Sequence, residues 1–304
     1  MIDIYKYTIC NSPVNLVSLR GREIFIKRDD KLNPNFSGNK ARKFFYFLTN
    51  QFPDIKRVVS YGSNQSNAMY SLSVLAKLKG WEFIYYVKHI SKYLKNNPSG
   101  NYKYALLNGM KVFISKNRPK REEIEDRETL FIEEGGRQLE ARFGIKMLAQ
   151  EIKLWQQAKN IDNLNIFLPS GTGTTALFLQ KYLLEIDSRF HSRVYTTPCV
   201  GDNHYLKLQF NMLEDNPLKH PDIIKPPKKF HFGKLYRELY TTWREVLEEI
   251  DIEFDLLYDP IGWITLLNTP KLLESSKPLM YIHQGGLRGN ETMLERYRRK
   301  FPDI

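Results

Sequence analysis

The sequence predicts an α/β protein with mostly parallel sheets. Strand-like runs at residues 57–61, 83–87 and 111–114 alternate with segments of helical apolar spacing, and a second series of the same kind starts at residue 165. A parallel strand can follow another only through a long crossover connection, usually a helix, so this alternation is typical of parallel sheets. The 304 residues, 42% of them hydrophobic, are enough for one large or two modest domains with buried cores.

The first predicted helix carries a lysine in its first turn. Residues 37–43 read Ser-Gly-Asn-Lys-Ala-Arg-Lys, apolar residues follow from Phe44 to Leu48, and Ser37 or Asn39 can cap the helix. The partial positive charge at a helix N-terminus disfavours an ammonium group, which biases Lys40 toward the neutral amine that a Schiff-base lysine needs. A lysine in this position is more often only a solvated surface residue.

The next strand ends in a polar turn that opens a helix. Residues 61–67 read Tyr-Gly-Ser-Asn-Gln-Ser-Asn, and the helix predicted over 66–79 stops at Gly80. Backbone amides and the Ser63 hydroxyl of such a turn can bind a substrate carboxylate. An ordinary cluster of helix-capping residues explains the same pattern.

A glycine-rich turn lies between an apolar strand at 165–168 and a helix from about 176 to 186. Its amides and hydroxyls at a helix N-terminus favour a phosphate group, although a plain structural turn has the same composition. A Rossmann site needs an acidic residue at the end of the next strand, where none occurs before Asp202, and the Gly-Lys-Ser/Thr of a Walker loop is absent. The predicted cradle for one phosphate consists of Gly171, Thr172, Gly173, Thr174 and Thr175.

The rest of the chain continues the alternation. A helix is predicted over 137–159, and strands are predicted at 194–196, 255–258 and 279–282. Four prolines in residues 215–229 predict a surface loop. Residues 283–286 read His-Gln-Gly-Gly after a strand and can border a pocket.

Composition limits the partners and the location. The net charge of +12 is spread over scattered basic clusters without an RNA-binding or zinc-finger signature, so no nucleic-acid partner is expected. Two cysteines without CxxC spacing indicate a reducing compartment, and neither a signal peptide nor a membrane-spanning run is visible. These features predict a cytoplasmic protein without a membrane partner. Six histidines lack metal-binding spacing, so no metal site is predicted.

Taken together, these stretches resemble the family of 1-aminocyclopropane-1-carboxylate deaminase and D-cysteine desulfhydrase, which belongs to the tryptophan-synthase-β-like, fold type II pyridoxal-phosphate enzymes. The order and spacing of the motifs are far more specific than any single motif, and the resemblance covers most of the chain. The residues that carry it are 27–30, 37–43, 63–65, 97–101, 134–136 and 170–174.

The resemblance implies a role for each motif. Lys40 would hold pyridoxal 5'-phosphate as the internal aldimine and move the substrate proton, and residues 171–175 would hold the phosphate. Ser63 would act as nucleophile or proton partner in the carboxylate-binding turn, and Asn64 would hydrogen-bond the pyridoxal oxygen. The expected substrate-binding residues are Ser63, Asn64, Gln65 and Tyr258.

One stretch departs from the family pattern. Relatives commonly have Asp-Pro-Val/Ile-Tyr-Glu or Tyr-Thr near the pyridine ring, whereas residues 259–263 read Asp-Pro-Ile-Gly-Trp. Gly262 and Trp263 remove the expected aromatic hydroxyl and the expected partner of the ring nitrogen, for which Tyr258 or Thr265 can substitute. Opening a cyclopropane is more demanding than eliminating a thiol, so this departure predicts more activity on D-cysteine, or a similar β-substituted amino acid, than on 1-aminocyclopropane-1-carboxylate.

We therefore expect two open, twisted, mostly parallel α/β domains with the cofactor in the cleft between them. The smaller would span 44–148, and the larger would combine 1–43 with 149–304. The expected function is lyase or deaminase chemistry on a small amino acid, releasing a 2-oxo acid and ammonia, in a homodimer. Two alternatives remain open: a non-catalytic relative that binds an amino acid or phosphate, which Gly262 and Trp263 favour, and a nicotinamide-dependent dehydrogenase, for which only the glycine pattern speaks.

Overall fold

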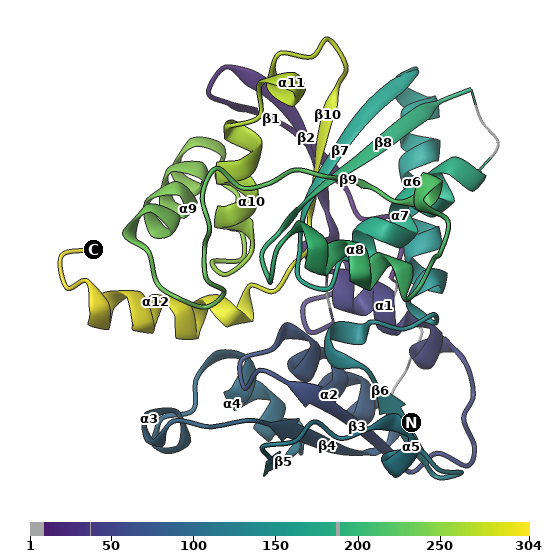
Figure 1. Cartoon of the computed structure of the whole chain (residues 1–304), viewed down its shortest axis with the longest axis vertical. Helices are drawn as coiled ribbons and strands as arrows, with labels where there is room; N and C mark the ends of the chain where they lie inside the picture. Colours follow the sequence, from purple (N-terminus) through teal and green to yellow (C-terminus); the bar gives the residue numbers. More distant parts are fainter. Residues whose placement is uncertain (1–8, 37, 187–188) are drawn as a thin grey trace.

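Two sheets make up the framework of the computed structural model, which describes residues 9–36, 38–186 and 189–304 (Figure 1). The larger sheet has six strands in the order β1-β2-β10-β7-β8-β9, and only β1 and β2 pair antiparallel. Its strands are β1 (Val14–Leu19), β2 (Arg22–Arg28), β7 (Asn163–Ser170), β8 (His191–Pro198), β9 (Asp222–Ile223) and β10 (Leu279–His283).

The smaller sheet is entirely parallel, with the strand order β5-β4-β3-β6. Its strands are β3 (Arg57–Gly62), β4 (Glu82–Val87), β5 (Lys111–Ile114) and β6 (Thr129–Ile132). Its main core is closed by α1 (Gly38–Thr49), α2 (Asn67–Lys79) and α4 (Gly100–Leu107). Two short helices, α3 (Lys92–Asn96) and α5 (Arg121–Ile124), complete this part of the chain.

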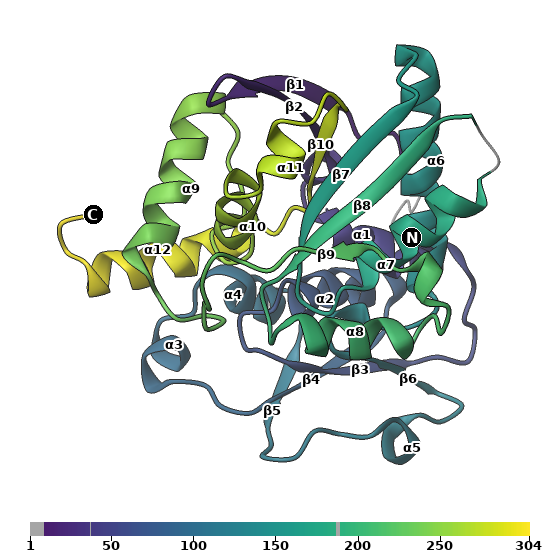
Figure 2. The same cartoon turned by 45° about the horizontal axis from the view of Figure 1, so that its top comes forward.

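Helices cover both faces of the larger sheet (Figure 2). Ile166 and Leu168 of β7 pack into one core with α6 (Ala141–Lys159) and α7 (Thr174–Glu185). Phe167 faces the opposite core with α9 (Arg237–Ile250), α10 (Asp259–Leu267) and α12 (Arg288–Lys300). Burial on both faces explains why these strands read as nearly continuous apolar runs. The remaining helices are α8 (Asn203–Asn211) and α11 (Pro270–Leu273).

A buried ionic network fixes α1 against the larger sheet. The guanidinium of Arg42, fully buried, pairs with Asp29 (Nη2 to Oδ1, 2.7 Å) and with Glu151 of α6 (Nη1 to Oε1, 2.6 Å). Lys27 of β2 pairs with the other oxygen of Glu151 at 2.6 Å. Removing one member of such a network leaves an uncompensated buried charge, so the network holds α1 at a defined position.

The observed elements confirm the predicted α/β fold and correct it in three places. Residues 255–258, predicted as a strand, form a turn, because Asp255 Oδ1 accepts hydrogen bonds from the backbone N–H groups of Leu257 (2.9 Å) and Tyr258 (2.7 Å). The proline-containing segment includes the short strand β9, and α6 starts at Ala141 rather than at residue 137. The β1–β2 hairpin was not predicted.

The division at residues 44 and 148 stays a prediction; the first boundary falls inside α1. No helix in the described ranges is long and apolar enough to cross a membrane.

Candidate active site

The carboxyl ends of strands from both sheets meet at a cavity of about 470 Å³. Its walls include the turns that follow β3, β7 and β10, together with the N-terminal turn of α1 and residues 255–259. Ligand sites of open α/β sheets lie at the carboxyl ends of the strands, because turns and helix N-termini converge there. The cavity is therefore the first place to test the predicted site residues.

Lys40 lies in the first turn of α1, as predicted, and its side chain lines this cavity. Burial lowers the pKa of Lys40 to about 8, and the charge of Asp255 opposes this shift. Within the described residues, its Nζ has no hydrogen-bond or ion-pair partner. A substantial neutral fraction near pH 8, combined with access to the cavity, suits a nucleophilic amine.

The start of α1 is held by the segment that follows β10. A Cβ on Gly38 would lie 1.9 Å from the carbonyl oxygen of Gln284, and Gly38 has a φ of +67°, so only glycine allows this approach. The backbone N–H of Asn39 donates to that carbonyl (3.0 Å), and its side-chain amide donates to Gln284 Oε1 (2.9 Å). Asn39 thus lies inside the helix and does not cap it, and Ser37 lies outside the described residues.

The glycine-rich turn forms an open helix N-terminus at the other side of the cavity. Gly173 (φ +73°) precedes α7 without any side-chain cap, so the first N–H groups of the helix keep their donor capacity. The hydroxyl of Thr175 is buried without a hydrogen-bond partner in the described structure. All five predicted cradle residues line the cavity: Gly171, Thr172, Gly173, Thr174 and Thr175.

The polar turn before α2 is divided between two cavities. Ser63 and Gln65 line the cavity that contains Lys40. Asn64 instead lines an adjoining chamber, and its Nδ2 donates to the carbonyl of His89 at 2.7 Å. The structure therefore brings Ser63 and Gln65, but not Asn64, to the wall of the cavity that Lys40 lines.

Several charged residues in the cavity were not predicted from the sequence. Burial raises the pKa of Asp255 to about 6, although the N–H groups of Tyr258 and Leu257, the Asn67 amide and the charge of Lys40 oppose the shift. The pKa of Lys43, whose Nζ donates to the Gly135 carbonyl (3.1 Å), is held well below its usual range by burial and by the charges of Lys40 and Arg137. Lys43 belongs to the 37–43 motif, but the pattern gave it no role, and Asp255 lies far from that motif in the sequence.

Gly262 does not leave a vacancy beside the cavity. A Cβ at this position would lie 2.6 Å from the hydroxyl oxygen of Tyr281. This hydroxyl donates to Asp259 Oδ1 (2.6 Å), and the Tyr281 ring stacks on the Trp263 ring with centroids 4.0 Å apart. Packing in the core therefore accounts for glycine at this position. The preference for D-cysteine over 1-aminocyclopropane-1-carboxylate stays a prediction, because this packing explains the glycine but does not test the substrate.

Of the two proposed substitutes, only Tyr258 lines the cavity. Its ring lies against the glycine-rich turn: Cε1 is 3.3 Å from where a Cβ on Gly171 would be. Thr265 is buried in α10, where its hydroxyl donates to the Ile261 carbonyl at 2.7 Å. From the segment after β10, Gln284 and Gly285 border the cavity. His283 is buried, and its Nε2 donates to the carbonyl oxygen of Glu253 at 2.7 Å.

Comparisons with known proteins agree with the motifs. No protein-family model matches the sequence. A putative 1-aminocyclopropane-1-carboxylate deaminase of Pyrococcus furiosus is 22% identical over 296 residues, which cover 90% of this chain and 88% of the relative. This relative confirms the resemblance that the motifs predicted.

Solved structures show the same fold. A homologue of 1-aminocyclopropane-1-carboxylate deaminase superposes with a TM-score of 0.77 at 20% identity, covering 96% of both chains. A hydrogen sulfide-producing enzyme of Fusobacterium nucleatum has a TM-score of 0.67 at 12% identity, over 95% of this chain and 99% of its own. A pyridoxal 5'-phosphate-dependent aspartate racemase has a TM-score of 0.60 at 15% identity over 90% of both chains. The predicted arrangement of two mostly parallel sheets is thus confirmed as the fold type II arrangement.

Proposed function

We propose that this chain is a pyridoxal-phosphate-dependent enzyme that performs lyase or deaminase chemistry on a small amino acid and releases a 2-oxo acid and ammonia. The observation that carries the proposal is that one cavity contains both the Lys40 amine and the open helix N-terminus of the cradle. Within the described residues, neither the amine nor the buried Thr175 hydroxyl has a hydrogen-bond partner. The donors at this turn suit a phosphate dianion. The residues present therefore fit the cofactor.

Each residue then has a chemical task. When bound, the cofactor supplies an electron sink for negative charge that develops at the substrate Cα. Lys40 Nζ holds the cofactor covalently and then carries the proton taken from Cα, for which a pKa of about 8 is well placed. Ser63, at the start of the turn before α2, binds the substrate carboxylate or exchanges a proton with the reacting part of the substrate. Tyr258 covers the phosphate-binding turn.

The decisive experiment locates the covalent bond. The protein is incubated with pyridoxal 5'-phosphate, reduced with borohydride, digested and examined by mass spectrometry; we expect the pyridoxyl group on Lys40. Lys43 is the matched control, because it lies one turn further along α1 and lines the same cavity. Lys43→Ala should leave the modification in place and Lys40→Ala should abolish it, whereas modification of Lys43 would reject the assignment.

Two alternatives remain less well supported. The hypothesis of a non-catalytic relative depends on Gly262 and Trp263, but neither residue lines the cavity in the described structure. A dehydrogenase rested only on the glycine pattern. We also propose a homodimer in the cytoplasm, and the assembly is tested by the mass of the purified protein in solution.

A further inference from the structure

A second chamber of about 400 Å³ adjoins the cavity that contains Lys40. Six residues line both spaces, so the two spaces lie side by side: Ser63, Gln65, Asn67, Phe232, Asp255 and Leu257. A water molecule occupies about 30 Å³ of liquid, so the chamber has room for roughly a dozen water-sized groups. This exceeds the needs of a thiol or a cyclopropane ring.

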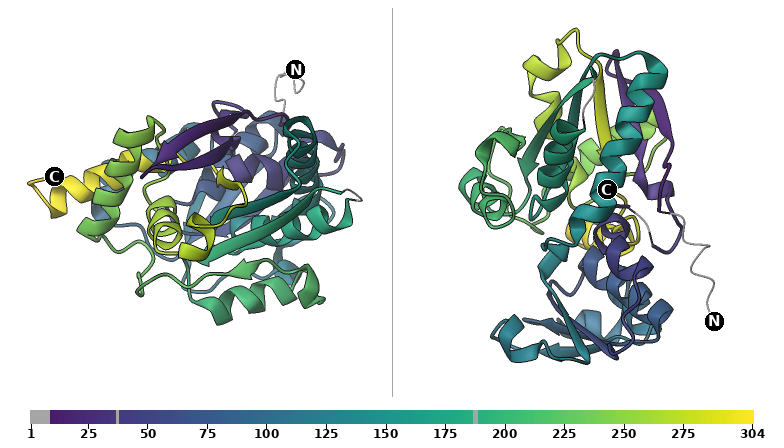
Figure 3. Two further views of the ribbon diagram at one scale, coloured as in Figure 1. Left: turned by 90° about the horizontal axis from the view of Figure 1, so that it is seen from above. Right: turned by 90° about the vertical axis from the view of Figure 1, so that its right-hand side faces the viewer.

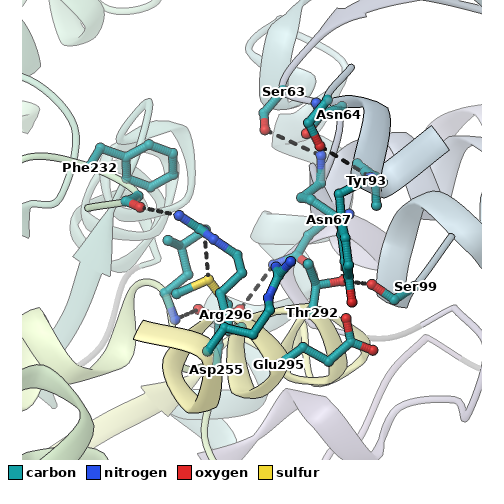
Figure 4. Close-up of a pocket in the computed structure, with 18 of the residues that line it drawn as sticks. Ser63, Asn64, Asn67, Tyr93, Ser99, Phe232, Asp255, Thr292, Glu295 and Arg296 are labelled. Carbon is teal, nitrogen blue, oxygen red and sulfur yellow. Dashed lines mark hydrogen bonds between the residues drawn. The ribbon is translucent and has the colours of Figure 1, made fainter. Parts of the chain in front are cut away.

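The chamber lies between the parts of the molecule that carry the two sheets. Helix α12 forms one wall and appears nearly end-on at the level between them in the right-hand view of Figure 3. Figure 4 shows Ser63 and Asn64 at one edge and Thr292, Glu295 and Arg296 of α12 at the opposite edge. The wall is tied to the start of α4 by Ser99 Oγ and Thr292 Oγ1, which are 2.9 Å apart. Thr292 Oγ1 also donates to Gln65 Oε1 at 3.2 Å, which links α12 to the turn that carries Ser63 and Asn64.

Arg296 is a half-buried cation, and no residue of the described chain serves as its counter-ion. Its Nη2 donates to the carbonyl of Gly233 at 2.7 Å, and its Nη1 approaches the sulfur of Met293 at 3.2 Å, a weak acceptor. Burial and the charge of Arg299 lower the pKa of Arg296. Among the residues that the structure describes, neither arginine forms an ion pair, and Arg299 stacks on the Tyr93 ring at 3.9 Å.

Two further features favour an anion that reaches this chamber from the Lys40 side. Gln65, on the shared wall, has a buried Nε2 without a hydrogen-bond partner in the described chain, so it retains donor capacity for a ligand. Glu295 is the acidic residue of α12 that lines the chamber, and its negative charge would disfavour an anion there. Figure 4 shows its side chain directed to the side of the helix away from Arg296. The region around Arg296 is therefore suited to a negatively charged group.

We propose that the chamber receives the side chain of the substrate and that Arg296 binds an anionic group at its end, so that the preferred substrates are amino acids with an acidic side chain. This inference rests on the proposed function, because only that function makes the ligand an amino acid. The anion site itself consists only of residues of this chain.

Isothermal titration with glutamate and with glutamine, each as both enantiomers, tests the proposal, because the two ligands differ in charge but little in shape. A hydrogen bond to a charged group contributes enough to change affinity by about tenfold to a hundredfold. We expect one enantiomer of glutamate to bind at least tenfold more tightly than the matching glutamine. Arg296→Gln should bring the two affinities close together.

Arg298→Gln is the matched control, because Arg298 lies on the same helix, is exposed and does not line the chamber. The preference for glutamate should survive in this variant. Equal affinities in the unaltered protein, or a preference that persists in Arg296→Gln, would overturn the inference.

The titrations are performed with and without bound cofactor, and Arg296→Gln is also checked for pyridoxyl labelling at Lys40. Labelling without a glutamate preference rejects the anion site alone. A glutamate preference without labelling rejects the proposed function and leaves the anion site standing.

Discussion

Replacing Asp255 by asparagine should change how stability depends on pH. Asp255 is 4% exposed, and burial raises its pKa from 3.8 to about 6. Burial therefore favours the protonated form in the folded state. The stabilisation from this group is complete below about pH 4 and is lost as pH rises through about 6.

The structure sets the size of the effect. A shift from 3.8 to about 6 corresponds to about 3 kcal/mol of unfolding free energy. Asparagine keeps the Oδ1 acceptor that receives the N–H groups of Leu257 and Tyr258, so the turn is retained. In the wild-type protein the amide nitrogen of Asn67 lies 3.3 Å from Asp255 Oδ2. In the variant it faces the new amide group, which lowers the unfolding free energy by an amount that does not vary with pH.

Urea denaturation at several pH values between 4 and 8 measures the effect, with the wild-type protein and Asp255→Asn compared at each pH. The variant should gain about 3 kcal/mol relative to the wild type between the acidic and alkaline ends. Asp251→Asn, at an exposed position after α9, controls for the general loss of a negative charge. A difference between wild type and Asp255→Asn that stays constant across this range would refute the reasoning.

Three further predictions concern the site and its support. Ser63→Ala should retain pyridoxyl labelling of Lys40 but lower kcat about a hundredfold, because a positioning or proton-transfer group is lost; normal turnover would make this turn only a helix cap. Arg42→Ala should lower the unfolding free energy by about 3–5 kcal/mol in urea, because it leaves two buried carboxylates short of their main partner, and a loss below 1 kcal/mol would contradict the buried network. Gly262→Ala should lower the Tm, because its Cβ meets the Tyr281 hydroxyl at 2.6 Å; adding Tyr281→Phe should recover part of the loss, and purely additive losses would argue against this contact.

Local patterns were sufficient where the chemistry depends on a few neighbouring residues. The position of Lys40 in a first helical turn and the placement of residues 171–175 before a helix follow from caps, glycines and apolar spacing, which act over one or two turns. The residues around 255 were misread as a strand, because Leu256, Leu257 and Tyr258 look β-prone while the turn is made by the Asp255 side chain.

Tertiary contacts decided what local patterns did not reveal. Asn64 looked equivalent to Ser63 and Gln65, but a hydrogen bond to the backbone of His89 on another strand-to-helix segment directs it to the second chamber. Gly262 of α10 looked like the loss of a functional group, whereas the hydroxyl of Tyr281, from strand β10, occupies the space beside it. Such contacts join residues far apart in the chain, so local sequence patterns did not predict them.

The order of strands has a consequence for synthesis on the ribosome. β10, at residues 279–283, pairs with β2 on one side and β7 on the other, so the nascent chain exposes two unpaired strand edges until residues 279–283 have been made. The four strands of the smaller sheet are contiguous between residues 57 and 132 and can pair much earlier. The start of α1 acquires its contact with Gln284 only after that residue has been made, so a chain that stops before it carries Lys40 without the segment that positions it.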